Sequence, residues 1–176
     1  MYTISKSIDI DFSHHVHGHQ GACINLHGHT WKFEVGLAAN TLDAEGFVID
    51  FKLLKQRVLE PCHTLLDHAL AVAAETYEQI QEELKGIGTA FLETRRPIHG
   101  RIDTAEPVSI QLYGAETRLP GGMKVAVFPF APTSERLAKW LYELADASLS
   151  DERVKVTYGR VYETLHPVAS IAEYTP

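Results

Sequence analysis

Two stretches of the chain alternate between apolar and polar side chains, and this alternation limits the fold more than any other feature. In residues 3–14, apolar side chains recur at even positions, among them Ile10 and Phe12, and His14 ends the row. In residues 29–37, the odd positions from Trp31 to Leu37 are apolar, and His29 is in phase with them. A period of two is typical of strands that bury one face, so both stretches are predicted to be half-buried strands.

The segment between these two strands, residues 13–31, holds six of the ten histidines of the chain. In an antiparallel pair, the end of the first strand lies beside the start of the second, so His14, His27 and His29 are expected to converge. Neutral imidazoles are good zinc ligands, and a catalytic zinc site uses three protein ligands and leaves the fourth position open. The pattern therefore predicts a metal site. The alternative is a solvated polar loop, which is the expectation for the other histidines of the segment, His15, His17 and His19.

The rest of the chain predicts two helices and two more strands. Residues 46–55 indicate a strand that leads into a helix, with Asp50 as its N-cap and Pro61 as its end. A second helix is expected to begin at Thr133, with Trp140 on its apolar stripe and therefore in the core. Alternating runs predict strands at 153–164 and 167–174.

Composition narrows the class of protein. A chain of 176 residues with 45% hydrophobic residues is expected to form one domain, 1–176, with an elaborated insertion at about 73–123 that contains a helix at 75–85 and a short hairpin. No long apolar run or signal peptide is visible, so we expect a cytoplasmic protein that does not bind a membrane. The net charge of -7 argues against nucleic-acid binding and favours a small-molecule partner.

Several motifs, taken in order, resemble the 6-pyruvoyl-tetrahydropterin synthase family. They are Ser-His14-x-Val, Cys23-x-x-x-His27-Gly-His29, Gly-x-Val-x-Asp50-Phe, Leu-Asp67-His68, Pro132-Thr-Ser-Glu-x-Leu-Ala and Tyr-Glu163-Thr. The resemblance covers roughly residues 3–72 and 127–174. It implies an α+β tunnelling fold, in which an antiparallel four-stranded sheet carries two helices on one face. It also implies a homo-oligomeric barrel, usually a hexamer built as a dimer of trimers.

The resemblance also implies roles for the metal and for the thiol. His14, His27 and His29 match the zinc ligands of the family, and Zn²⁺ would act as a Lewis acid on a dihydropterin substrate. Cys23 matches the catalytic thiol that removes a proton from the substrate. The alternative for Cys23 is a small core residue. The other cysteine, Cys62, is expected to be a free thiol or a ligand rather than half of a disulfide.

Five further positions match family residues that handle protons or hold the substrate. Asp67 and His68 match its acid and base partners, against the alternative of a capping aspartate beside a surface histidine. Glu163 matches the carboxylate that anchors the pterin, with Thr133 and Ser134 as further pterin contacts. The alternatives are a solvated strand residue for Glu163 and a helix cap for Thr133.

The spacing of the cysteine motif favours one branch of the family. Cys23 and His27 are four apart, which resembles the branch that makes 6-carboxy-5,6,7,8-tetrahydropterin from 7,8-dihydroneopterin triphosphate for queuosine synthesis. The alternatives are a 6-pyruvoyl-tetrahydropterin synthase, a member that acts on another pterin, and a non-catalytic zinc-binding oligomer. The chain departs from the family pattern at His15, where an arginine often follows the first ligand. Arg95, Arg96 and Arg101 in the long insertion are candidates for triphosphate contacts.

Overall fold

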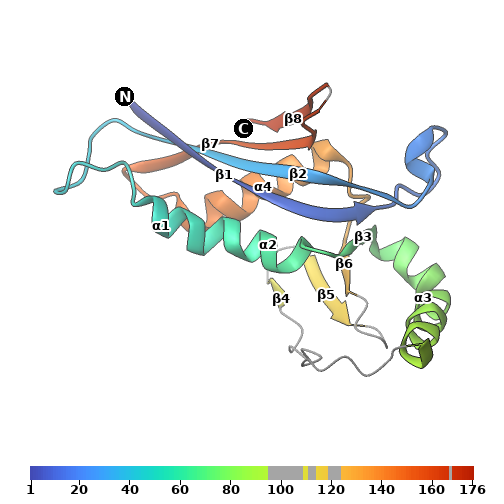
Figure 1. The fold of residues 1–176 in the computed structure, drawn as a ribbon. Helices are drawn as coiled ribbons and strands as arrows, with labels where there is room; N and C mark the ends of the chain where they lie inside the picture. Colours follow the sequence, from blue (N-terminus) through green and yellow to red (C-terminus); the bar gives the residue numbers. More distant parts are fainter. Residues whose placement is uncertain (95–108, 111–113, 119–123, 167) are drawn as a thin grey trace.

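The chain folds around one eight-stranded sheet in a computed structural model, which describes residues 1–94, 109–110, 114–118, 124–166 and 168–176 (Figure 1). The hydrogen-bonded order is β4-β5-β6-β3-β1-β2-β7-β8. The strands are β1 Tyr2–His14, β2 His27–Ala39, β3 Leu70–Ala73, β4 Ser109–Ile110, β5 Gly114–Arg118, β6 Lys124–Phe128, β7 Val154–Thr164 and β8 Ser170–Tyr174.

The two strands predicted from the alternation are the longest pair in the sheet. β1 and β2 run antiparallel in an unbroken register from the pair Tyr2 and Ala39 to the pair His14 and His27. The central inward positions are buried, since Phe12 is 4% exposed and Trp31 and Phe33 are 0% exposed, while Ile4 and Ile8 are partly buried. The period of two in the sequence therefore predicted both strands and the face of each strand that packs in the core.

The sheet has more strands than the four predicted. The four predicted strands correspond to β1, β2, β7 and β8, and their pairings are antiparallel as expected. The ladder continues on the other side of β1, where β3 pairs parallel with Ser13 and His14 and β6 pairs parallel with β3. The sheet is thus mixed. β3 and β6 have four and five residues, and runs this short show no usable period in the sequence.

The first helical stretch begins where predicted but continues past Pro61. Asp50 caps it, because its carboxylate accepts a hydrogen bond from the Lys52 amide at 2.7 Å. The stretch comprises α1 Phe51–Leu54, the π-helical turn η2 Lys55–Leu59 and α2 Glu60–Leu66. The predicted end at Pro61 is wrong. Just before Pro61, the Glu60 amide bonds the Lys55 carbonyl, and this wider turn accommodates a residue that lacks its own amide hydrogen.

The predicted strand at the start of this region is also absent, because residues 43–47 form a turn. The Asp43 carboxylate accepts hydrogen bonds from the amides of Glu45 and Phe47 at 3.0 and 2.8 Å. Gly46 has a φ of 88°, which glycine adopts without strain. An aspartate that bonds its own following backbone competes with strand formation, and here it prevails.

The second predicted helix is α4, Ser134–Leu149, with Thr133 as its N-cap. Trp140 is 1% exposed and lies in the core, as predicted. α4 packs closely against β7, where Gly159 lies directly beneath the backbone of Ala138 and Tyr142. Both α4 and the stretch from α1 to α2 lie on the same face of β1, β2 and β7 (Figure 1), so the prediction of two helices on one face holds for these elements.

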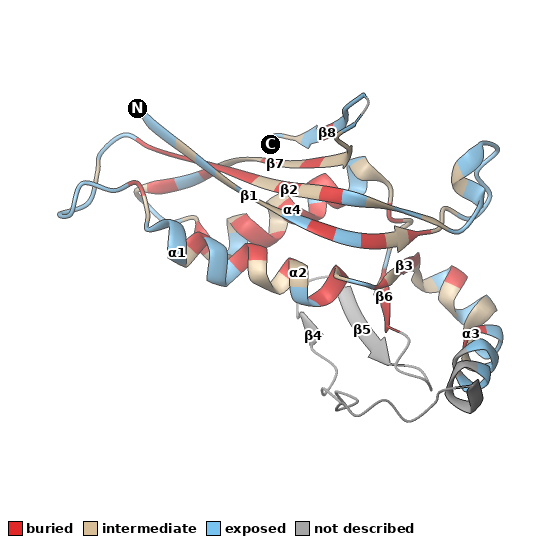
Figure 2. Ribbon diagram, viewed as in Figure 1, coloured by how far each residue is buried: buried red, intermediate tan, exposed pale blue. Residues whose placement is uncertain are grey.

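The core lies between this helical layer and the central strands. Figure 2 shows the buried residues concentrated where the helices and the strands face each other. The largest buried side chains come from both layers, among them Trp31, Trp140, Phe33 and Phe128.

The insertion is more structured at its start than predicted. Its helix, α3, spans Ala74–Thr94 and is longer than the expected 75–85. It packs through Leu84 on Val72 of β3 and Val125 of β6, which makes a small second cluster of buried residues. β5 pairs antiparallel with β4 and with β6, which agrees with a hairpin in this region. Arg95, Arg96 and Arg101 lie outside the described residues. None of the described helices combines the length and apolar character needed to cross a membrane.

The close approach of α4 to β7 generates a prediction about stability. A Cβ on Gly159 would lie 2.5 Å from the Ala138 carbonyl oxygen and 2.6 Å from the Tyr142 amide nitrogen. Because backbone atoms cannot rotate away, Gly159→Ala should lower the free energy of unfolding by about 1–3 kcal/mol. The control is Gly86→Ala in α3, where a Cβ meets nothing within 4 Å and helix propensity improves. Thermal unfolding compares the two variants, and equal melting temperatures would contradict the argument.

Candidate metal centre and active site

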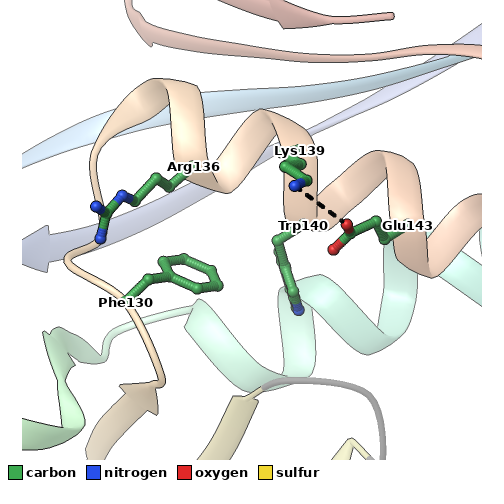
Figure 3. Close-up of a pocket in the computed structure, with 5 residues that line it drawn as sticks. All are labelled: Phe130, Arg136, Lys139, Trp140 and Glu143. Carbon is green, nitrogen blue, oxygen red and sulfur yellow. Dashed lines mark ion pairs between the residues drawn. The ribbon is translucent and has the colours of Figure 1, made fainter. Parts of the chain in front are cut away.

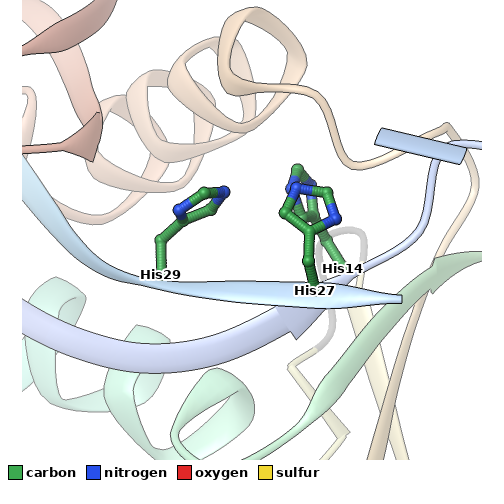
Figure 4. Close-up of side chains that lie close together, drawn as sticks. All are labelled: His14, His27 and His29. Atoms are coloured by element: carbon green, nitrogen blue, oxygen red, sulfur yellow. The ribbon is translucent and has the colours of Figure 1, made fainter. Parts of the chain in front are cut away.

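Three histidines converge at the end of the β1–β2 pair. His14 is the last residue of β1, and His27 and His29 begin β2, with His14 directly opposite His27 in the register. Their side chains rise from the same face of the sheet and turn toward one another (Figure 4). One ring nitrogen from each lies within 4.8 Å of the others, so this group could hold a metal ion. His15, His17 and His19 are not part of the group.

Aromatic residues of the core pack against one side of this group. His14 is 1% exposed, and its ring packs edge-on against Trp31, with ring centres 4.9 Å apart. Trp31 in turn stacks on Phe12, the inward residue that precedes His14 on β1. Burial lowers the pKa of His14 below the usual histidine value, and it lowers the pKa of His29 as well. Both rings therefore favour the neutral form that binds metal.

Backbone carbonyls orient two of the rings. The Nδ1 atom of His14 lies 3.0 Å from the Pro132 carbonyl oxygen, and the Nδ1 atom of His27 lies 2.8 Å from the Asn25 carbonyl oxygen. A carbonyl oxygen only accepts hydrogen bonds, so each Nδ1 is the nitrogen that carries the hydrogen. In a neutral ring, Nε2 then holds a bare lone pair. Metal-binding histidines usually donate their other ring N–H to a carbonyl or carboxylate oxygen in this way, which fixes the tautomer and the orientation of the ring.

The two bare lone pairs face each other. The Nε2 atoms of His14 and His27 lie only 3.1 Å apart. Without a hydrogen on either atom, this contact is repulsive unless a cation stands between them. Two nitrogens bound to one zinc ion at 2.0–2.1 Å in tetrahedral geometry would be about 3.3 Å apart, close to the observed separation. His14 and His27 are therefore spaced as two ligands of one tetrahedral metal ion, and His29 offers a third nitrogen within 4.8 Å of both.

A carboxylate completes the surroundings of the group. Glu163 of β7 places Oε1 3.5 Å from Nε2 of His14 and 3.9 Å from Nε2 of His29. The Ser134 hydroxyl donates to the other oxygen, Oε2, at 3.1 Å. A negative charge here favours a cation among the histidines. Two residues that the sequence assigned to the substrate, Glu163 and Ser134, thus lie beside the predicted metal ligands.

A hollow opens beside Glu163 and His29. It has a volume of about 380 Å³ and is lined by His29, Thr30, Glu163, Thr164, Leu165 and His166. A space of this size suits a small planar ligand, with the Glu163 carboxylate on its wall. Thr30 and His166 were not predicted as site residues. Thr30 is out of phase with the inward row, and His166 follows the end of β7, so neither carries a periodic signal.

Thr133 acts first as a helix cap. Its hydroxyl accepts a hydrogen bond from the Arg136 amide at 3.4 Å, which satisfies one free donor at the start of α4. The preceding residue, Pro132, supplies the carbonyl that orients His14. The start of α4 therefore supports the metal group through its backbone and the Glu163 carboxylate through Ser134.

The three predicted catalytic residues lie outside the close group of histidines. Cys23 is half-buried in η1, a 3-10 turn at Ala22–Ile24, and the group of neighbouring ligand atoms does not include its thiol. Asp67 and His68 follow the end of α2 and pair with each other, with Nδ1 of His68 2.9 Å from Oδ2 of Asp67. The carboxylate thus orients the imidazole, while the His68 side chain is 81% exposed.

A second hollow lies over α4, away from the histidines. It is lined by Phe130, Arg136, Lys139, Trp140 and Glu143 (Figure 3). Lys139 and Glu143 form an ion pair across its edge, 3.7 Å apart. None of the residues predicted to act in catalysis or to bind substrate or metal lines this hollow.

Comparisons with known proteins agree with the motifs. A protein of Haemophilus influenzae named 6-carboxy-5,6,7,8-tetrahydropterin synthase is 26% identical over 167 residues, which cover 93% of this chain and 94% of that protein. A protein of Aquifex aeolicus with the same name is 31% identical over 157 residues, which cover 86% of this chain and 75% of that protein.

A solved structure shares the fold. The 6-pyruvoyl tetrahydropterin synthase of Caenorhabditis elegans superposes with a TM-score of 0.57 at 16% identity, over 99% of this chain and 95% of that one. The family model described as 6-pyruvoyl tetrahydropterin synthase matches residues 3–174, nearly the whole chain. With its motifs in order and its histidines converged, the chain belongs to the 6-pyruvoyl tetrahydropterin synthase family.

Proposed function

We propose that the protein is a zinc-dependent lyase that converts 7,8-dihydroneopterin triphosphate to 6-carboxy-5,6,7,8-tetrahydropterin, an intermediate for queuosine synthesis. The observation that carries the proposal is the pair of bare Nε2 atoms 3.1 Å apart, which calls for a shared cation. The relatives from Haemophilus influenzae and Aquifex aeolicus support the product by their names. The four-residue step from Cys23 to His27 supports the same branch.

His14, His27 and His29 would hold the zinc ion. Bound there, zinc supplies a Lewis acid for the side-chain oxygens of the substrate, which makes a proton on the adjacent carbon easier to remove. Three protein ligands would leave such an ion open to the substrate. The Nδ1 hydrogen bonds to Pro132 and Asn25 keep the rings of His14 and His27 in place while a ligand enters.

Glu163 would bind the pterin. A carboxylate can accept two hydrogen bonds from the amino-pyrimidine edge, and Glu163 stands on the wall of the hollow beside His29. Ser134 holds Oε2 of this carboxylate, so the anchor is positioned before substrate arrives. Thr133 is adjacent and offers a further contact to the ring.

Cys23 and the Asp67–His68 pair would move protons. Cys23, as thiolate, would take the proton from the carbon next to the bound oxygens. Asp67 keeps Nδ1 of His68 protonated, which leaves Nε2 free to exchange protons with the substrate or the thiol. Cys62 is not a candidate for proton transfer, because complete burial raises the pKa of its thiol far above neutrality.

Assembly into a homo-oligomer, with a hexamer as the expected form, fits an open edge of the sheet. Apart from Ser13 and His14, which pair with β3, β1 pairs only with β2 among the described strands. A long strand edge of this kind invites pairing with another chain. A second copy would also supply a second Asp67–His68 pair near the sheet edge. We place the protein in the cytoplasm.

The reaction test is turnover of 7,8-dihydroneopterin triphosphate by the zinc-loaded protein, with the product identified by mass. The proposal expects the 6-carboxy product with loss of triphosphate and a two-carbon fragment. A pyruvoyl product would assign the chain to the alternative branch. Binding of zinc without any turnover would favour the non-catalytic alternative.

Histidines inside and outside the group should differ in their effect on zinc content. Purified protein should carry about one zinc ion per chain, and His27→Ala should lose nearly all of it, because one of three ligands is gone. His17→Ala, in the same segment but outside the group, should keep its zinc. Metal analysis by mass spectrometry compares the two. Full zinc content in His27→Ala would show that the site is misplaced.

Replacement of Cys23 distinguishes a catalytic base from a zinc ligand. If the thiol is the base, Cys23→Ala should keep its zinc and its melting temperature but lose turnover by about a hundredfold to ten-thousandfold. The control is Cys62→Ala, which creates a small cavity in α2 and should lower stability more than the rate. Single-turnover rates and zinc content are measured on both variants. Loss of zinc in Cys23→Ala would make the thiol a ligand instead.

A further inference from the structure

One lysine is buried next to the Asp67–His68 pair. Lys124, the first residue of β6, is only 9% exposed. Its Nζ donates hydrogen bonds to the carbonyl oxygens of Thr64 and Asp67, the latter at 3.0 Å. Lysine is seldom buried unless its charge is well coordinated, so this placement indicates a specific task.

The two carbonyls belong to the end of α2. Asp67 is the C-cap of this helix, and Thr64 lies in its last turn. The last carbonyls of a helix have no partner within the helix and carry the negative end of its dipole. An ammonium group placed there satisfies these oxygens and favours this end of the helix. Lys124 therefore fixes the point at which the chain leaves α2 and enters the Asp67–His68 turn.

The turn itself holds an unusual conformation. His68 has a φ of 58°, the left-handed region that residues other than glycine adopt only when their surroundings hold them. The His68 amide donates to the Asp11 carbonyl at 2.7 Å, and the Ala69 amide donates to the Leu66 carbonyl at 2.8 Å. Lys124 holds the carbonyl immediately before His68, so it borders the strained residue.

The direction of the His68 side chain depends on this backbone. Its ring is largely exposed, and within the described part of the chain its Nδ1 pairs with Oδ2 of Asp67. The left-handed φ of His68 and the hydrogen bonds of its neighbours decide where the ring points. A shift of the Asp67 carbonyl would move both members of the pair together.

We propose that Lys124 is a positioning residue that locks the Asp67–His68 turn in its active conformation through the carbonyl of Asp67. The inference rests on the proposed function, in which Asp67 and His68 transfer protons. Lys124 contacts backbone atoms and takes no part in the chemistry itself. It lies in β6, after the long insertion, so the support for the pair comes from a part of the chain distant in sequence.

The test replaces the ammonium and follows both the rate and the turn. Lys124→Met keeps most of the side-chain volume without donors, and Lys124→Arg keeps charge and donors. Lys85→Met is the control, because Lys85 is a partly exposed lysine of α3 whose ammonium bonds Glu82, away from the Asp67–His68 turn. Zinc content and thermal unfolding are measured for every variant, together with kcat, KM and hydrogen exchange of the His68 amide. If Lys124→Met does not stay folded, Lys124→Gln replaces it, with smaller changes in kcat and exchange in the same direction, because its amide still donates hydrogen bonds but carries no charge.

Lys124→Met should lower kcat by about tenfold to a hundredfold with KM changed less than about threefold, because substrate binding is intact while the pair is displaced. Exchange of the His68 amide should become at least about tenfold faster, while amides in the centre of β2 keep their rates. Lys124→Arg should restore much of the rate, and Lys85→Met should match the wild type.

Three results would overturn the proposal. The first is a kcat of Lys124→Met equal to that of the wild type despite faster His68 exchange, and the second is a lost rate with unchanged exchange. The third is a Lys124→Met variant in which neither kcat nor His68 exchange changes, which would show that Lys124 does not hold the turn. If the wild type does not turn over dihydroneopterin triphosphate, the proposed function fails. The exchange measurement then still decides whether Lys124 holds the turn.

Discussion

The antiparallel register of β1 and β2 is the constraint on which the rest of the structure depends. With His14 opposite His27, the rows that contain Phe12 and Trp31 face the core together. A slip of one residue between the two strands would turn one of the two apolar rows to solvent and place His14 on the face opposite His27 and His29. The energy that specifies the register comes from the buried aromatic and aliphatic side chains. The metal ligands therefore inherit their position from hydrophobic burial.

Backbone atoms then convert three nearby rings into a site with a preference for cations. The Pro132 carbonyl, 118 residues from His14 in the chain, selects the tautomer of the buried ring, and the Asn25 carbonyl does the same for His27. Both choices aim a lone pair at one point, and Glu163 brings a negative charge to the same place. The start of α4 contributes to two of these three effects, through the Pro132 carbonyl and through the Ser134 hydroxyl that holds Glu163, so the geometry of the site depends on where α4 packs on the sheet.

The sequence predicted those features of the fold and the site that depend on residues close together in the chain. The alternation identified β1, β2 and the inward phase of His14 and His29, and the capping roles of Asp50 and Thr133 followed from side-chain chemistry. The parallel pairings of β3 and β6 could not be predicted, because they join short runs separated by the insertion. The turn that tolerates Pro61 and the carbonyl partners of the histidines depend on backbone geometry, which side-chain patterns do not encode. Glu163 was assigned to substrate by resemblance alone, and only the fold shows its proximity to the histidines.

β1 contacts both groups of residues in the proposed reaction, the metal ligands and the Asp67–His68 pair. Its inward face carries His14, and its edge away from β2 receives the chain that follows α2. On that edge the Asp11 carbonyl accepts from the His68 amide, and the Ser13 amide donates to the Ala69 carbonyl at 3.0 Å. The histidines that would bind zinc and the Asp67–His68 pair are thus held by the same four-residue segment of β1, Asp11 to His14. The segment from Asp11 to His14 is bonded on both edges, so its displacement would disturb the metal ligands and the Asp67–His68 turn together rather than one of them alone.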